Sequence, residues 1–246
     1  MRTYDFGPDV LAFSTLRGGA VDPGEQAARS DLAYNGYNQW RALENRRRLA
    51  ERLGIGPEDF VIPHQVHSDK VTYVSSPGQP EGVDAVFTDT AGLCVCVSTA
   101  DCIPLLLHDV RHRAVAAIHA GWRGTVIRIV QRTLAEMHST LGTRGSDVRA
   151  VIGPGISLEA FEVGDEVFEA FHAAGFPMER IAQRREKWHI DLWEANRLQL
   201  EEAGVTDIRL EATCTYAHPD RYYSARRLGI KSGRILNGIL LKHTTI

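Results

Sequence analysis

The stretch Ala114–Gly124, AVAAIHAGWRG, decides how this chain is interpreted. Small and β-branched residues up to Ile118 predict a buried strand, which delivers His119 to its carboxyl end. The two glycines that follow permit a tight turn, and an apolar stripe at helical spacing begins near Thr125. A strand, a glycine turn and a helix in this order expose backbone N–H groups at the positive end of the helix dipole. Such a junction can hold a phosphate or another oxyanion close to His119.

Outward from this stretch, strand-like and helical patterns alternate irregularly. Strand-like runs cover Val10–Ser14, Phe60–Ile62, Lys70–Val74, Ala85–Thr88, Leu93–Ser98, Pro104–His108, Ala114–His119, Val148–Ile152, Ile208–Ala212 and Ile235–Leu241. Helical patterns cover Asn38–Leu53, Thr125–Leu141, Asp165–Ala174 and Asp191–Ala203, and a short helix is expected after Pro57. Strands outnumber helices about two to one, which argues against a simple doubly wound sheet. We therefore predict a mixed α/β layered sandwich that forms a single domain over residues 1–246.

Composition narrows the class of protein. The chain has 246 residues, a formal net charge of −3 and a hydrophobic fraction of 43%. These values suit an ordinary buried core, and without a basic tail we expect no broad attraction to nucleic acid. The first residues lack the pattern of a signal peptide, and no apolar run approaches the roughly 20 residues of a membrane span. The four cysteines favour free thiols in a reducing compartment, so we expect a cytoplasmic protein with no membrane contact.

Three residues at the ends of predicted strands, His67, Cys102 and His119, are candidate zinc ligands. Two imidazoles and a thiolate leave a fourth position for water, as in catalytic zinc sites, where the metal lowers the pKa of water to about 7. Their spacings of 35 and 17 residues match no short ligand motif, and a strand histidine beside glycine is also commonly a hydrogen-bonded core residue. Asp101 is a further catalytic candidate, which would orient groups or shuttle protons, or only cap a turn. His64 fits a hydrogen-bonding partner of this site, a fourth ligand or, more commonly, a surface residue.

Other polar and thiol groups have more than one interpretation. Cys94 and Cys96 alternate with valines on one strand and are expected to be packing residues. Arg17, Arg46 and Arg226 are candidate phosphate ligands, because guanidinium binds phosphate through two hydrogen bonds. Arg17 is the first choice, since the two following glycines let the backbone approach a ligand closely. Arg46 belongs to a basic run, which more commonly forms a solvated helix face.

A set of motifs runs in the order of one known family over nearly the whole chain. The matching segments are Thr15–Gly19, Glu44–Arg46, Gln65–Ser68, Asp84–Thr88, Thr99–Pro104, His119–Gly124, Ile152–Ile156, Cys214–Thr215, Tyr223–Arg227 and Ser232–Arg234. The chain thereby resembles the YfiH-like laccase-domain family, once described as multicopper polyphenol oxidases and now regarded as purine nucleoside phosphorylases with adenosine deaminase activity. One mild departure is Ser68, where the family usually has glycine.

The resemblance implies a fold, a metal and substrates. It implies an α/β/β/α layered sandwich and a zinc ion held by His67, Cys102 and His119. It implies phosphorolysis of adenosine, inosine and methylthioadenosine with phosphate, together with deamination of adenosine. Gln65, in a matching segment, is then expected to contact substrate. Some bacterial relatives are also linked to peptidoglycan editing.

Three other functions fit parts of the pattern. With Cys102 as nucleophile and His119 as base, the chain would be a cysteine hydrolase, for example of an amide in a cell-wall precursor, and would need no metal. A copper oxidase is disfavoured, because a multicopper site needs many clustered histidines and the ten histidines here are dispersed. A binding module would bind nucleoside without turnover.

Overall fold

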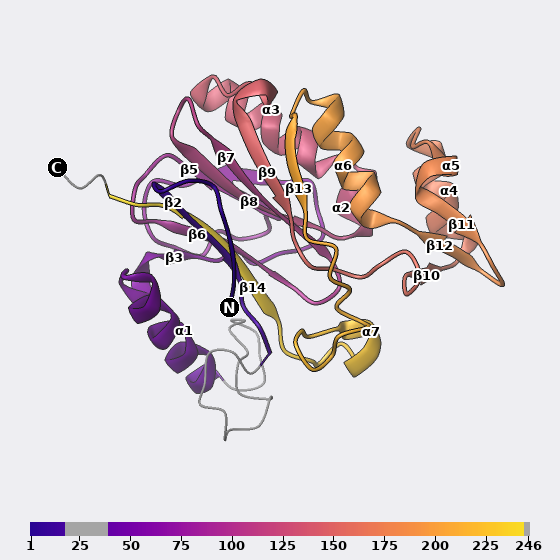
Figure 1. Ribbon diagram of the computed structural model, residues 1–246, viewed down its shortest axis with the longest axis horizontal. Coiled ribbons are helices and arrows are strands. Elements are labelled where there is room, and N and C mark those ends of the chain that lie inside the picture. Colours follow the sequence, from indigo (N-terminus) through magenta and orange to yellow (C-terminus); the bar gives the residue numbers. More distant parts are fainter. Residues whose placement is uncertain (18–38, 244–246) are drawn as a thin grey trace.

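The computed structural model describes residues 1–17 and 39–243, and within them fourteen strands and seven α-helices (Figure 1). The strands are β1 (Arg2–Tyr4), β2 (Val10–Ser14), β3 (Phe60–Val61), β4 (Val71–Tyr73), β5 (Ala85–Thr88), β6 (Cys94–Thr99), β7 (Ile103–Asp109), β8 (Ala114–Ala120), β9 (Val148–Ile152), β10 (Glu162–Val163), β11 (Ala182–Arg184), β12 (Trp188–Ile190), β13 (Asp207–Leu210) and β14 (Ile235–Leu241). The helices are α1 (Gln39–Leu53), α2 (Trp122–Val126), α3 (Ile129–Leu141), α4 (Asp165–Ala173), α5 (Met178–Ile181), α6 (Leu192–Glu202) and α7 (Ala225–Leu228).

Two sheets lie face to face between layers of helices. One sheet has the order β1-β2-β14-β6-β3 and the other β13-β9-β7-β8-β5-β4. A core rich in valine fills the space between them, and it draws Val95 from one sheet and Leu106 from the other. Helix α1 covers the outer face of the first sheet, whereas α3 and α6 cover that of the second (Figure 1). The predicted α/β/β/α sandwich is therefore confirmed.

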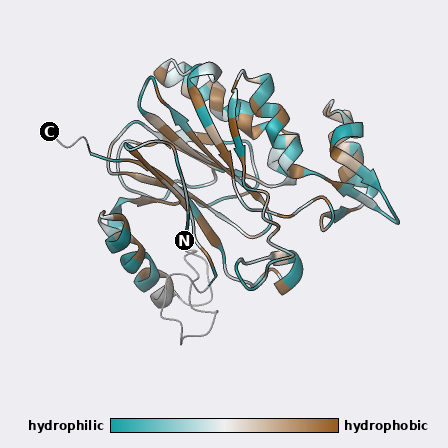
Figure 2. Ribbon diagram, viewed as in Figure 1, coloured by the Kyte–Doolittle hydropathy of each residue, from teal (hydrophilic) through white to brown (hydrophobic). Residues whose placement is uncertain are grey.

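The central strands are buried on both faces, which explains their almost unbroken apolar runs. Every residue of β7 and β8 is buried, and these two strands are antiparallel neighbours in the middle of the second sheet. Figure 2 shows hydrophobic residues concentrated along the strands, whereas the helices carry alternating hydrophilic and hydrophobic patches. Strands that bury both faces need no alternation of apolar and polar residues along the chain. They support the residues at their ends.

The single helix predicted over Thr125–Leu141 is wrong, because the chain breaks at Arg128. Helix α2 ends at Val126, and Arg128 adopts a left-handed conformation with φ of 65° before α3 begins. The Arg128 guanidinium donates to the Ala174 carbonyl over 3.1 Å and pairs with Glu202 over 3.1 Å. These tertiary contacts hold a backbone conformation that the apolar periodicity could not reveal.

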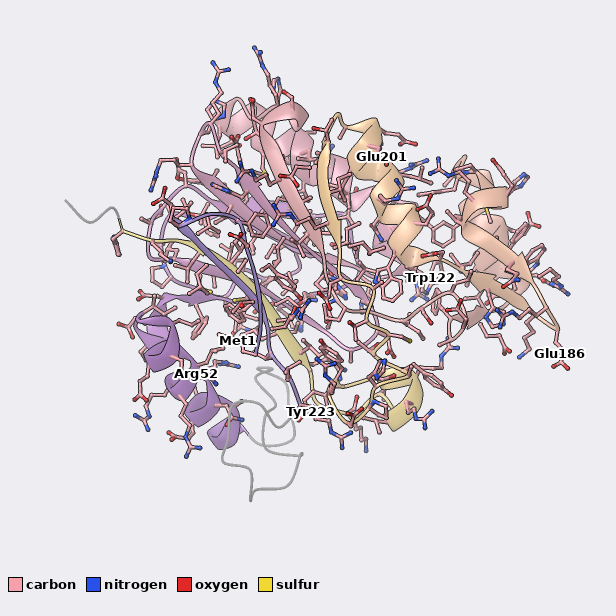
Figure 3. All side chains as sticks on the ribbon, viewed as in Figure 1. Met1, Arg52, Trp122, Glu186, Glu201 and Tyr223 are labelled. Atoms are coloured by element: carbon pink, nitrogen blue, oxygen red, sulfur yellow. The ribbon has the colours of Figure 1, made fainter. Side chains whose placement is uncertain are left out.

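A small third sheet, β10-β12-β11, was not predicted. Its strands have only two or three residues, and β10 and β11 include charged side chains, so they lack the long apolar signal of the central strands. With α4 and α5 it forms a projection beside α6, and Figure 3 shows Glu186 at the tip of the β11–β12 hairpin. Short polar strands of this kind depend on their neighbours rather than on their own sequence.

Most of the remaining helix predictions hold. Asp191 caps α6, since its side chain accepts a hydrogen bond from the Glu194 backbone N–H over 2.9 Å. The predicted start of the first helix at Asn38 lies outside the described residues. The short helix expected after Pro57 is a 3₁₀ helix at Pro57–Asp59. Among the described residues, none of the helices has the length and apolar character needed to cross a membrane.

Candidate metal centre

Cys102 and His119 meet because of the register of β7 and β8. The antiparallel pairing places Pro104 opposite His119 and Ile103 opposite Ala120. Cys102 directly precedes β7 and therefore lies where β8 ends. Two candidate ligands that are distant in sequence thus reach the same sheet edge through one hairpin.

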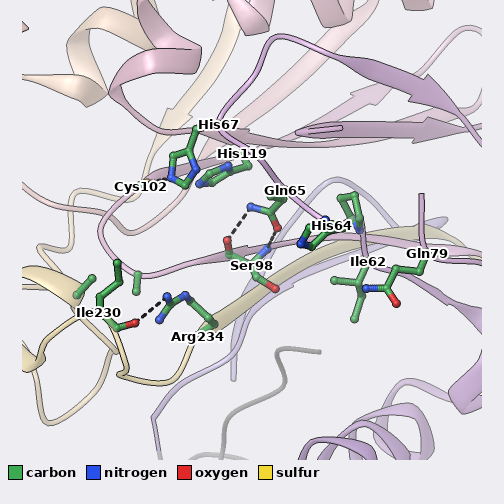
Figure 4. A pocket seen from close by; sticks show the side chains of 13 residues that line it. Ile62, His64, Gln65, His67, Gln79, Ser98, Cys102, His119, Ile230 and Arg234 are labelled. Atoms are coloured by element: carbon green, nitrogen blue, oxygen red, sulfur yellow. Dashed lines mark hydrogen bonds between the residues drawn. The ribbon is translucent and has the colours of Figure 1, made fainter. Parts of the chain in front are cut away.

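The third candidate ligand, His67, comes from the connection between β3 and β4. The Gln65 side chain attaches this connection to β6, since its amide accepts from the Ser98 N–H over 2.7 Å and donates to the Ser98 carbonyl over 2.9 Å. His67 itself has a φ of 60°, a left-handed conformation that is uncommon outside glycine. Its ring lies edge-on to that of His119, with 4.8 Å between the ring centres (Figure 4). Gln65 therefore supports the site through the backbone of β6.

The three side chains fit a single metal ion. Their ligand atoms lie within 4.8 Å of one another, and Cys102 Sγ is 4.0 Å from His67 Nε2. Bonds of about 2.0–2.3 Å in a tetrahedral zinc site separate ligand atoms by roughly 3.5 Å, so a small inward movement would close the site. A Cβ on Gly121 would lie 2.9 Å from His67 Cδ2 and 3.1 Å from the Cys102 sulfur, so the backbone packs closely beneath the cluster. Among the described residues this is the one such group of histidine, cysteine and acidic side chains.

Asp84 is a site residue that sequence analysis missed. It is fully buried directly before β5, and the β5–β8 register places it beside His119. One carboxylate oxygen is 2.8 Å from His119 Nδ1 and accepts the His67 N–H over 3.0 Å. The other accepts the Val66 N–H over 3.2 Å and both the N–H and the hydroxyl of Ser68, over 2.7 and 2.8 Å. The sequence contained Asp84 at the start of a matching segment, directly before a buried strand, but did not distinguish it as a site residue, since its contacts depend on strand pairing.

The site holds charge that burial alone would disfavour. Burial would raise the pKa of Asp84, but hydrogen bonds from His119 and Ser68 lower it to about 2. Burial would also raise the pKa of Cys102, but the charge and hydrogen bond of His119, followed by those of His67, lower it to about 6. The pKa of His119 rises to about 9, because the Cys102 thiolate and Asp84 outweigh the opposite effect of burial. The neighbouring groups therefore favour the thiolate of Cys102 and the imidazolium of His119, each of which stabilises the other.

Asp101 links the cluster to the wall of the neighbouring pocket. It has a φ of 90°, and its carboxylate accepts the Thr215 hydroxyl over 2.6 Å and the Arg226 N–H over 2.7 Å. The second bond anchors the first turn of α7, while the Asp101 carbonyl accepts the Ile156 N–H over 2.9 Å. Both carboxylate oxygens thus hold backbone segments around Cys102, which fits the turn-holding role considered from the sequence.

The three arginines that were candidates for phosphate have different surroundings. Arg17 donates to the Pro219 carbonyl and lies 5.6 Å from the Tyr223 ring centre, and the two glycines that made it the first choice lie outside the described residues. Arg226 is exposed on α7 and donates to the Glu162 carbonyl over 3.0 Å. The expectation of a solvated Arg46 is wrong, because it lies on the inward stripe of α1 and is 3% exposed.

A cavity of about 350 Å³ opens beside the cluster (Figure 4). Its described lining consists of Ile62, Pro63, His64, Gln65, His67, Gln79, Ser98, Ala100, Cys102, His119, Ala225, Ile230 and Arg234. The arginine in this lining is Arg234, whose guanidinium donates to the carbonyls of Ile230 and Gly233 over 3.1 and 3.2 Å. His64 lies on the wall and pairs with Glu81 over 3.0 Å, so it belongs to the pocket rather than to the ligand cluster. The sequence contained Arg234 in a matching segment without distinguishing it as a site residue.

A layered α/β fold with a histidine–cysteine–histidine cluster beside a cavity defines a candidate metalloenzyme. A family model described as "Multi-copper polyphenol oxidoreductase laccase" matches residues 11–242. A purine nucleoside phosphorylase from Bacteroides thetaiotaomicron is 48% identical over 248 residues, which cover 95% of this chain and 92% of that protein. The adenosine deaminase RL5 from an unknown prokaryotic organism is 39% identical and covers 95% of this chain and 94% of its own length.

Solved structures agree with the sequence matches. YlmD from Geobacillus stearothermophilus superposes with a TM-score of 0.88 at 28% identity, covering 96% of this chain and 93% of that chain. The YfiH protein of Bacillus licheniformis gives a TM-score of 0.87 at 26% identity, with coverage of 95% and 93%. The chain therefore belongs to the multi-copper polyphenol oxidoreductase laccase family. These matches confirm the resemblance inferred from the sequence and the prediction of an enzyme.

Proposed function

We propose that the chain is a zinc-dependent purine nucleoside phosphorylase that acts on adenosine, inosine and methylthioadenosine and also deaminates adenosine. The observation that carries this proposal is one cavity with the His67, Cys102 and His119 cluster in its wall and both apolar and cationic residues in its lining. The names of the relatives from Bacteroides thetaiotaomicron and the unknown prokaryote support the two activities.

The donor set favours zinc over copper. Two imidazoles, one thiolate and an open position are the pattern of catalytic zinc sites. A multicopper site needs several clusters of ligands, whereas the described residues contain one. When bound, zinc would supply a Lewis acid and an acidified water for attack on C6 of adenine.

The remaining residues of the cavity would bind and orient the nucleoside. Ile62, Pro63 and Ile230 offer apolar surface that suits the faces of a purine base. Gln65 would keep the wall in place through Ser98. Asp101 would hold α7, and with it Ala225, against the cluster.

Phosphate is the second substrate, and Arg234 is the best-placed cation for it. Phosphorolysis requires a dianion beside C1′ of the ribose, and guanidinium is well suited to phosphate oxygens. Arg17, Arg226 and Arg234 all donate to backbone carbonyls, and Arg234 to those of Ile230, Ser232 and Gly233. Arg234 is the one of the three that belongs to the described lining of the cavity. Backbone N–H groups at the start of α2 would add to this positive potential.

An assay on adenosine with and without phosphate tests the proposal. The zinc-loaded chain should release adenine and ribose 1-phosphate when phosphate is present, and inosine when it is absent. Arg234→Ala should lower phosphorolysis about 10–150-fold, the equivalent of one charge-assisted contact of roughly 1.5–3 kcal/mol, and should lower deamination much less. Arg227→Ala, an exposed arginine on α7 outside the cavity lining, is the matched control and should leave both rates nearly unchanged. Equal loss of both activities in Arg234→Ala would assign Arg234 to nucleoside binding or to its own loop.

The geometry also favours a second candidate, a cysteine hydrolase. Asp84, His119 and Cys102 form a carboxylate–imidazole–thiol series, with a thiol pKa of about 6. Such a nucleophile would act without metal on an amide, for example in a cell-wall precursor. Two results together would favour the cysteine hydrolase over the zinc-dependent phosphorylase. The first is rapid alkylation of Cys102 without loss of bound zinc, and the second is amide cleavage in the presence of a chelator.

The proposal extends to the organisation and location of the protein. We propose one catalytic domain over residues 1–246, with small nucleosides and phosphate as its partners. A cytoplasmic location is supported by four free cysteines, since such thiols suit a reducing compartment.

A further inference from the structure

We propose that Asp84 is a positioning residue that fixes the tautomer of His119 and, through the same carboxylate, the backbone of His67. The consequence is that His119 offers Nε2, and not Nδ1, to the metal. The inference rests on the proposed metal site and not on the proposed substrates.

The hydrogen-bond donors around position 84 require a side chain that only accepts, namely a carboxylate. The groups facing its two oxygens are the backbone N–H groups of Val66, His67 and Ser68, the Ser68 hydroxyl and His119 Nδ1. The three backbone groups can only donate, and an ionised carboxylate can only accept. His119 Nδ1 must therefore carry its proton to bond the same oxygen as the His67 N–H, which leaves the Nε2 lone pair for the cluster.

The same contacts hold the strained part of the loop between β3 and β4, which carries His67. His67 is in the left-handed region at φ of 60°, a conformation that persists only when its surroundings fix it. Asp84 receives the N–H of His67 and those of both sequence neighbours, so three consecutive amides converge on one side chain. One ligand from β8 and one from the loop between β3 and β4 thus share one orienting group, which makes their relative placement depend on Asp84.

Replacing Asp84 by asparagine preserves its shape but breaks this pattern. An amide has one acceptor oxygen and one NH₂ donor. If the NH₂ faces His119, the ring must turn into the tautomer with the proton on Nε2, which blocks that nitrogen as a ligand. If the NH₂ faces Ser68, it opposes two backbone donors, and the loop that carries His67 must shift.

Asp109 provides a matched control in the same chain. It is also fully buried, accepts the N–H groups of Arg111 and His112 over 2.9 Å each, and lies 2.8 Å from His112 Nδ1. The described ligand cluster does not include His112. Asp109→Asn therefore repeats the chemical change at a buried aspartate–histidine pair without touching the metal site.

The test is competition for Zn²⁺ between the full chain and a chelator of known affinity. Asp84→Asn should bind Zn²⁺ about 10–100-fold more weakly, the usual cost of losing a group that orients a metal ligand. Asp109→Asn should stay within about twofold of the unmodified chain. An Asp84→Asn affinity within about twofold would overturn the inference, as would an equal loss in both variants. Failure of the unmodified chain to bind Zn²⁺ would instead overturn the metal site itself.

Nitrogen NMR of the unmodified chain gives a test that needs no folded variant. With ¹⁵N-labelled histidine, His119 in the zinc-loaded protein should show a protonated Nδ1 and a metal-bound Nε2. A metal-bound Nδ1 in the unmodified chain would overturn the inference whatever the variants do.

Discussion

The two ends of the β7–β8 hairpin carry similar pairs of aspartate and histidine with different surroundings. At one end Asp84 meets His119, and at the other Asp109 meets His112, each over 2.8 Å to Nδ1. Hydrogen bonds outweigh burial in both carboxyls and lower the pKa of each below its usual range. The His119 side chain is 4% exposed and faces Cys102 and His67, whereas that of His112 is 29% exposed.

The difference lies in the sequence separation of the contacts. Asp109 and His112 are three residues apart, and their bond closes the turn between the two strands. Asp84 and His119 are 35 residues apart and meet only through the β5–β8 register. A buried carboxylate–histidine pair is therefore not sufficient for a metal site. A metal site also requires further ligands close by, and the candidates here lie directly before β7 and in the loop after β3.

Replacing the histidine at each end of the hairpin should give the largest difference in zinc affinity between two matched variants. His119→Ala should weaken Zn²⁺ binding by more than about 100-fold, because a ligand is lost outright, which exceeds the effect of losing its orienting partner. His112→Ala should bind Zn²⁺ within about twofold of the unmodified chain. Chelator competition measures both affinities, and equal losses would show that the two ends are not functionally distinct.

Zinc affinity should rise with pH at the His119 end. Because the pKa of His119 is about 9 and that of Cys102 about 6, the metal displaces one proton, from His119, between these values. The affinity should therefore increase about tenfold per pH unit from 6.5 to 8.5, measured by competition at each pH. A zinc affinity that does not change with pH would contradict the assignment of a Cys102 thiolate and a His119 imidazolium.

The stability of the metal-free protein should depend much less on pH over the same range. A raised histidine pKa makes stability fall as pH rises from about 6.5 to 9, since the folded state holds the extra proton. A lowered cysteine pKa makes stability rise from about 6 to 9, since the unfolded state holds the proton. The two effects oppose each other, and denaturant unfolding in chelator should show a nearly level profile.

Adding one methyl group at Gly121, beside His67 and Cys102, should moderately lower both the unfolding free energy and the zinc affinity. Gly121 has φ of −70° and ψ of 169°, which alanine adopts readily, so Gly121→Ala acts through the close contacts of its Cβ with His67 and Cys102. We expect a loss of roughly 1–3 kcal/mol in unfolding free energy from overpacking, and a severalfold weaker zinc affinity. Gly78→Ala, where a Cβ meets nothing within 4 Å, is the control. Equal unfolding curves for the two variants would mean that His67 and Cys102 move aside with no loss of unfolding free energy, which would contradict the prediction.

Thiols away from the hairpin end should have no effect on metal binding. Cys94 and Cys96 are fully buried on the face of β6 that packs with Leu49 of α1, as predicted from their alternation. The double variant Cys94→Ala, Cys96→Ala should retain its zinc, although small cavities should lower stability by roughly 1–3 kcal/mol. Metal analysis of this variant checks the prediction, and lost zinc would place these thiols in the metal site.

The comparison also explains how far the sequence could be interpreted. Strands, helix caps and the ligand set carry local or motif signals, so the sandwich and the cluster of His67, Cys102 and His119 could be predicted. Asp84 begins a matching segment, but its role could not be predicted, because that role arises from the pairing of β5 with β8. The burial of Arg46 and the break at Arg128 likewise depend on partners distant in sequence.

Metal analysis of the purified full chain beside its Cys102→Ala variant tests the central claim most directly. Cys102 is partly exposed at the start of β7, so its truncation should leave the fold largely intact. The account predicts one zinc ion per chain in the unmodified protein and less than about a tenth of that in the variant. Full zinc occupancy in Cys102→Ala, or several copper ions in the unmodified chain, would contradict it.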